Sequence, residues 1–225
     1  MIVIIGDSWG VGEWGVESTR SMAINGPGIA QFLNYNFNVL NLSKGSGSNL
    51  LGLDLLDKFL SRYQPDNTDE FYWIVTEPIR DTAVTDLLDI VGIESHLKNV
   101  LTQSFTTADQ LAKKHNINIK LIGGWCDIEP NWIDRFSTLK VVVPSWGSIV
   151  HKNYPRSIFG PTNLRELKIT YTNNSSQKSE WLDIVEKVDA KINTWKTSGW
   201  RAMHPDRYSH RKLRDFLYPE LSEFY

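Results

Sequence analysis

The sequence is poor in cysteine, has no long hydrophobic run and carries almost balanced charge. Its one cysteine, Cys126, excludes an internal disulfide and cannot build a thiolate metal site. No apolar stretch approaches the roughly 20 residues that span a bilayer. A net charge of −2 at pH 7 gives no electrostatic reason to expect nucleic acid or a membrane surface as a partner. These absences argue against a secreted disulfide scaffold, a membrane protein and a nucleic-acid-binding protein.

What is present is typical of a globular protein. The 225 residues are 41% hydrophobic and 22% charged, and can bury a sizeable core. No signal peptide precedes the first hydrophobic run at residues 2–5, so we expect a cytoplasmic location. No linker rich in proline or charge divides the chain. We therefore predict one domain over residues 1–225, with a loop insertion at about 145–178, where periodicity is weak; the oligomeric state stays open.

Short β-branched runs alternate with helical patterns along the chain. The predicted strands are 2–5, 37–42, 71–75, 117–122 and 139–143. The predicted helices are 27–35, one following Asn49, one ending near Asn116, one opening at Ser179 and one at 208–217, whereas 11–24 reads as a polar loop. This alternation predicts an α/β fold with a parallel sheet covered on both faces, which binds ligands beyond the carboxyl ends of its strands.

A serine lies directly after the first predicted strand. Ile2 to Ile5 runs into Gly6-Asp7-Ser8-Trp9-Gly10. Glycines on both sides of a serine permit a tight strand-to-helix turn that exposes its hydroxyl. The same pattern also fits an ordinary glycine-rich turn in which Ser8 caps the next helix.

A nucleophilic serine needs a base, and five histidines can supply it: His96, His115, His151, His204 and His210. His204 stands out because Pro205 follows it and disfavours helix, which holds the histidine in an extended loop before the last helix. His210 falls inside that helix and is interpreted as structural. His96 and His115 lie on a polar helix face, and nothing around His151 points to the site.

Together these two segments resemble a known family. Gly6-Asp7-Ser8 after an N-terminal strand and His204-Pro205 before the last helix resemble the first and last blocks of the GDSL/SGNH hydrolases. The resemblance implies a three-layer α/β/α, flavodoxin-like fold with about five parallel strands. It also implies a serine esterase that forms an acyl-enzyme and needs neither metal nor cofactor, with Ser8 as nucleophile and His204 as base.

The resemblance is uneven at the base. The family places an aspartate three residues before the histidine, and this chain has Arg201 there. Asp206, Asp127 or a backbone carbonyl can take its place, or Ser8 and His204 act as a dyad.

The oxyanion donors also depart from the family pattern. The second block resembles Ser43 to Asn49, where either Gly45 or Gly47 donates its N–H and Asn49 resembles a family asparagine. The third block lacks its asparagine in residues 76–81 (TEPIRD). Thr76 or Arg80 can present a donor there, or Arg80 and Asp81 form a structural ion pair.

Nine tryptophans are many for 225 residues. Six lie in or near loops that follow predicted strands: Trp9, Trp14, Trp125, Trp132, Trp146 and Trp200. Flat aromatic faces suit a sugar ring, which favours a carbohydrate O-acyl ester as substrate. The alternative is that these rings pack the loops. The competing function is a catalytically decayed module that binds saccharide or serves a structural role.

Overall fold

The computed structural model describes residues 1–16, 22–82, 92–159, 178–197 and 204–224. Its centre is a five-stranded sheet of order β4-β1-β5-β6-β7 in which every pair is parallel. The strands are β1 (Ile2–Ile5), β4 (Val39–Asn41), β5 (Glu70–Val75), β6 (Ile119–Gly123) and β7 (Leu139–Val143). The five strands predicted from the sequence are confirmed, with shifts of at most two residues at their ends.

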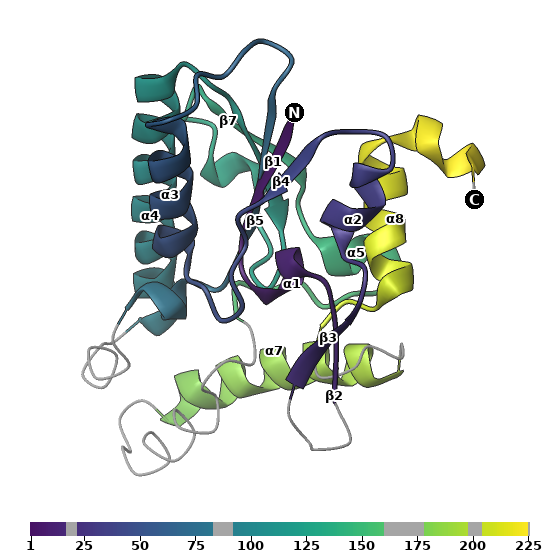
Figure 1. Ribbon diagram of the computed structural model, residues 1–225. Coiled ribbons are helices and arrows are strands. Elements are labelled where there is room, and N and C mark those ends of the chain that lie inside the picture. The colour runs from purple at the N-terminus through teal and green to yellow at the C-terminus, as the bar shows by residue number, and fades with distance from the viewer. Residues whose placement is uncertain (17–21, 83–91, 160–177, 198–203, 225) are drawn as a thin grey trace.

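Helices cover both faces of the sheet, which makes the three-layer α/β/α arrangement visible in Figure 1. One face carries α3 (Asn49–Leu60) and α4 (Ile93–His115), and the other carries α2 (Ile29–Asn34), α5 (Trp146–Val150) and α8 (Arg207–Leu217). The helix α7 (Lys178–Thr197) lies past the carboxyl ends of the strands. Short 3₁₀ helices are η1 (Pro78–Asp81), η3 (Pro130–Trp132) and η4 (Pro219–Phe224).

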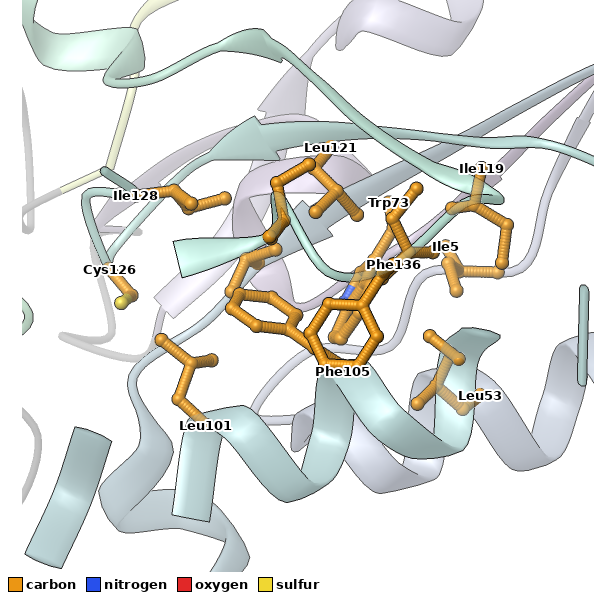
Figure 2. Close-up of a cluster of buried hydrophobic side chains, with 14 of the residues drawn as sticks. Ile5, Leu53, Trp73, Leu101, Phe105, Ile119, Leu121, Cys126, Ile128 and Phe136 are labelled. Carbon is orange, nitrogen blue, oxygen red and sulfur yellow. The ribbon is translucent and has the colours of Figure 1, made fainter. Parts of the chain in front are cut away.

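The alternation of side chains along the strands supplies two cores. Val3 and Ile5 of β1 pack into the core under α3 and α4, whereas Ile2 and Ile4 pack into the core under α2, α5 and α8. All four are buried, as a parallel sheet covered on both faces requires. Figure 2 shows the first core, where the Phe105 ring lies between α4 and the sheet.

Local signals in the sequence fix the helix ends. The Ser48 hydroxyl caps α3 by accepting a hydrogen bond from the Leu51 N–H at 3.2 Å. Asn116 ends α4 in the left-handed conformation, at φ 52°, and its N–H bonds back to the last turn. Asn116 was the terminator predicted from the sequence.

Two segments differ from the prediction. Residues 11–24, expected to be a polar loop, contain the end of α1 (Ser8–Val11) and an antiparallel hairpin of β2 (Glu13–Val16) and β3 (Met22–Gly26). No Asn-Gly or Asp-Gly turn marks this hairpin in the sequence, which is why it was missed. The expected insertion at 145–178 opens with α5, capped by Ser145, and its residues 160–177 lie outside the described part of the chain.

No helix in the described ranges combines the length and the apolar character needed to cross a bilayer.

Phe105→Ala should lower the free energy of unfolding by about 3–5 kcal/mol, because the ring is fully buried between Trp73 and Phe136 and its loss leaves a cavity. Urea titration followed by circular dichroism measures the change. Leu182→Ala, at a side chain 52% exposed on α7, is the control and should shift stability by less than about 0.5 kcal/mol. Equal losses would contradict the packing described.

Candidate active site

The turn after β1 presents Ser8 at the carboxyl edge of the sheet. Gly6 lies so close to β5 that a Cβ there would be 3.0 Å from the Ile74 carbonyl oxygen. Asp7 then caps α1 by accepting a hydrogen bond from the Trp9 N–H at 3.0 Å. Ser8 is therefore the first residue of a short helix, and its N–H points out of the helix end.

His204 reaches Ser8 from the far end of the chain. Its Nε2 lies 2.7 Å from Ser8 Oγ, although 196 residues separate the two in the sequence. Both side chains are nearly buried, with 6% exposure each. The structure thus brings together the two residues that the sequence singled out as nucleophile and base.

Asp206, a possible acid for His204, has another task in the structure. Its Oδ1 accepts hydrogen bonds from the Ser209 N–H at 2.8 Å and the Ser209 hydroxyl at 2.6 Å. Asp206, two residues after His204, is the N-cap of α8 and fixes the start of that helix at Arg207. Arg201, at the position of the family aspartate, lies outside the described residues.

Behind Ser8 lies a fully buried carboxyl group. Asp7 Oδ2 accepts a hydrogen bond from the Thr76 hydroxyl at 2.7 Å and lies 3.7 Å from the Arg80 guanidinium. Burial raises the pKa of Asp7, while Arg80, Thr76 and the Trp9 N–H oppose the rise. Thr76, expected to be an oxyanion donor, thus gives its hydroxyl to Asp7.

A second buried carboxyl group shares the same guanidinium. Arg80 Nε donates to Glu77 Oε1 at 3.2 Å. Glu77 Oε2 is buried with no hydrogen-bond partner in the described part of the chain. Burial raises the pKa of Glu77 from 4.5 to about 7, although the Arg80 guanidinium acts to lower it. Since Asp7 accepts more hydrogen bonds, Glu77 is the carboxyl group of this pair that holds a proton more readily.

Two other residues expected to be oxyanion donors, Asn49 and Gly47, form hydrogen bonds with neighbouring protein groups. The Asn49 side chain exchanges two hydrogen bonds of 2.9 Å with the Thr76 backbone. The Gly47 N–H donates to the Lys44 carbonyl at 3.0 Å, and the Gly47 carbonyl accepts from Arg80 at 3.3 Å. Gly45 is exposed in the same turn. These contacts tie the 44–49 loop to β5.

The alternative interpretation of Arg80 and Asp81 as a structural ion pair is wrong. The Asp81 carboxylate accepts hydrogen bonds from the Asn49 and Leu50 N–H groups, at 3.2 and 3.0 Å, and so holds the start of α3. Arg80 instead pairs with Asp7 and Glu77.

Sequence reasoning missed a buried lysine behind the site. Lys191 is fully buried on α7 and forms an ion pair of 2.8 Å with Asp127, another residue considered as the acid. It also donates to the Trp125 carbonyl at 3.1 Å and the Ser157 carbonyl at 2.6 Å. A signal was present: Lys191 stands three residues after Val188, in the apolar stripe of its helix.

The interpretation of the tryptophans as a sugar-binding surface is wrong for three of them. Trp9, Trp125 and Trp146 are 0–3% exposed and pack against one another, with ring centroids 5.6 Å apart for Trp9 with each of the other two. Trp132 is half-buried beside Lys98. The side chain of Trp14 and the whole of Trp200 lie outside what the structure describes.

Three of the remaining histidines have other partners, whereas His96 is half-buried on α4 and its Nε2 has no hydrogen-bond partner among the described residues. His210 is fully buried, accepts a hydrogen bond from the Ile29 N–H at 3.2 Å and packs on Trp146, which fits the structural role expected for it. His115 contacts Asp57 at 2.8 Å, and His151 stacks on Tyr154. Among the described residues, no group of three or more His, Cys, Asp or Glu is placed to hold a metal ion.

No family model and no curated protein sequence matches this chain. Among solved structures, the crystal structure of TesA is similar over 99% of this chain and 98% of its own, at 14% identity and a TM-score of 0.42. A likeness this distant says nothing about activity. The fold class follows from the sheet order and the covering helices, and the chemistry from the residues around Ser8.

Glu77→Gln should flatten the dependence of stability on pH. A folded pKa of about 7 against an ordinary 4.5 means that the folded state binds a proton more tightly than the unfolded chain between these values. The stability Glu77 contributes is therefore complete below about pH 4.5 and is lost as the pH rises to about 7, on the order of 3 kcal/mol in all. Urea unfolding of both proteins from pH 4.5 to 8 measures the difference, and an offset that is constant with pH would contradict it.

His210→Gln should act in the opposite direction. Burial lowers the pKa of His210 from 6.5 to about 3, so the unfolded chain takes up a proton that the folded state refuses. The wild type should lose about 2 kcal/mol relative to the variant between pH 7 and pH 5. The same unfolding series tests this, and a wild type that gains stability relative to the variant as the pH falls would show that the histidine is charged in the fold.

Proposed function

We propose that this protein is a serine ester hydrolase in which Ser8 and His204 form the catalytic pair. The observation that supports it most directly is the 2.7 Å contact between Ser8 Oγ and His204 Nε2. That distance lies within the range for a nucleophile and its general base. The pair lies at the carboxyl edge of a parallel sheet, where ligands of this fold class bind.

The proposed reaction proceeds in two halves. His204, neutral and protonated on Nδ1, takes the proton from Ser8 as Oγ attacks the ester carbonyl. It then gives that proton to the departing alcohol, which leaves an acyl group on Ser8. In the second half His204 takes a proton from water, the hydroxide attacks the acyl-enzyme, and the proton returns to Ser8 as the acid is released.

The tetrahedral oxyanion needs hydrogen-bond donors on one side of Ser8. The Ser8 N–H, at the start of α1, is the first candidate. The Gly45 N–H is the better second candidate of the two predicted, because the Gly47 N–H already donates to Lys44. Loss of one such donor costs about 10²–10³-fold in rate.

The tryptophans near Ser8 and His204 affect which class of substrate is favoured. A carbohydrate O-acyl ester stays the substrate class predicted from the sequence. The buried positions of Trp9, Trp125 and Trp146 remove three of the six rings on which that preference was based.

Ser8→Ala and His204→Ala should each abolish most hydrolysis of p-nitrophenyl acetate, since general-base help alone is worth about 10²–10⁴-fold. The double variant should be little slower than either single variant, because the two side chains act as one unit. Initial rates at matched protein concentration measure this. His115→Ala, at a histidine bound to Asp57 away from Ser8, is the control and should keep full activity.

A catalytically decayed module is the competing function, favoured by Asp206 and Thr76 being engaged in structural hydrogen bonds. A fluorophosphonate probe separates the two. Labelling of the wild type that disappears in Ser8→Ala supports the hydrolase, and a wild type that is never labelled supports the decayed module.

A further inference from the structure

The Trp125 ring touches the base directly. Its centroid lies 5.5 Å from that of the His204 imidazole, with the two planes at 82°. The Arg80 guanidinium lies over the same indole, 5.2 Å from its centroid. Trp125 is thus a shared contact between the proposed base and the cation that binds Asp7 and Glu77.

The backbone that carries this ring is fixed on two sides. Gly124 bonds to the Val75 carbonyl at 3.2 Å, and a Cβ at this glycine would be 2.8 Å from Ile74 Cγ2. The buried Lys191 ammonium donates to the Trp125 carbonyl at 3.1 Å. A tryptophan held between β5 and α7 in this way has little freedom to move.

The indole is anchored by packing alone. Its Nε1 is buried and lacks a hydrogen-bond partner throughout the described ranges. Trp9 and Trp195 pack against it at 5.6 and 5.8 Å. A buried donor left without an acceptor costs about 1–3 kcal/mol, so stability alone would favour a phenylalanine here.

We propose that Trp125, backed by Arg80, positions the His204 imidazole for proton transfer with Ser8. This inference rests on the proposed function and adds a positioning residue to it. The indole fixes the plane of the imidazole by perpendicular aromatic packing, a preferred geometry of such pairs.

Arg80 connects this contact to the nucleophile. It lies over the indole, pairs with Asp7, which precedes Ser8, and donates to the Gly47 carbonyl. Asp7, which loses its proton more readily than Glu77, balances its charge, so the guanidinium does not strongly oppose a proton on His204. The segments that follow β1, β5 and β6 and the 44–49 loop thereby share one set of contacts.

Trp125→Leu should lower kcat for p-nitrophenyl acetate between about tenfold and about 100-fold, because small displacements of a catalytic group have effects of that size. KM should change little, since the ring is 3% exposed and packs behind the imidazole. Trp125→Phe, which restores an aromatic ring, should recover most of the rate. The matched control is Trp73→Leu: Trp73 is also fully buried with an unpartnered Nε1, but packs on Phe105 in the other core.

The second readout does not depend on turnover. In protein labelled with ¹⁵N-histidine, the His204 ring signals are assigned by their loss in His204→Gln. They should be a single narrow set in the wild type and Trp73→Leu, and should broaden or double in Trp125→Leu. Should Trp125→Leu fail to fold, Trp125→Phe is measured in its place, with a smaller change of the same kind.

The two proposals fail in distinguishable ways. If the wild type is not labelled by fluorophosphonate, the hydrolase proposal fails and the ring signals alone decide the positioning role. If it is labelled, either an unchanged kcat or unchanged ring signals in Trp125→Leu overturns that role. A loss of rate as large in Trp73→Leu as in Trp125→Leu overturns it as well.

Discussion

A carboxylate that is wholly removed from water must be compensated inside the protein, and Asp7 is such a group at the centre of this structure. Its partners are the Trp9 N–H, the Thr76 hydroxyl and the Arg80 guanidinium. These partners come from the turn after β1 and from the segment after β5, so the two strand ends are fixed relative to each other. Because Ser8 is the next residue, its position follows from the hydrogen bonds of Asp7.

The same constraint explains why buried charge gathers at one edge of the sheet. Glu77 and Arg80 adjoin Asp7, and Lys191 pairs with Asp127 behind the same loop. Buried ion pairs contribute little net stability, since desolvation offsets their attraction. Their concentration beside Ser8 is better explained by the chemistry proposed for the site.

The sequence was enough to predict the sheet but only part of its surroundings. The uninterrupted run Ile2–Ile5 ends at a glycine and is typical of a buried strand. Leu139–Val143 is rich in β-branched residues and ends before Pro144, which predicts a strand although Lys140 is exposed. The closeness of Ser8 and His204 was predicted because both follow recognisable local patterns. Partners that depend on long-range geometry carried no local signal: nothing in residues 76–81 says that Arg80 bonds Glu77 and Asp7 while Asp81 holds α3.

The burial of the tryptophans is a second feature that the sequence did not predict, and it alters how the surroundings of Ser8 and His204 are interpreted. A ring in a loop after a strand can face solvent or turn inward, and the sequence does not tell which. Trp9, Trp125, Trp146 and Trp195 turn inward and form one aromatic cluster behind His204. Such a wall excludes water, and in a medium of low dielectric constant the hydrogen bond between Ser8 and His204 is stronger than it would be in solvent. The aromatic content that suggested a surface for sugars is therefore better explained as the dry side of the proposed catalytic pair.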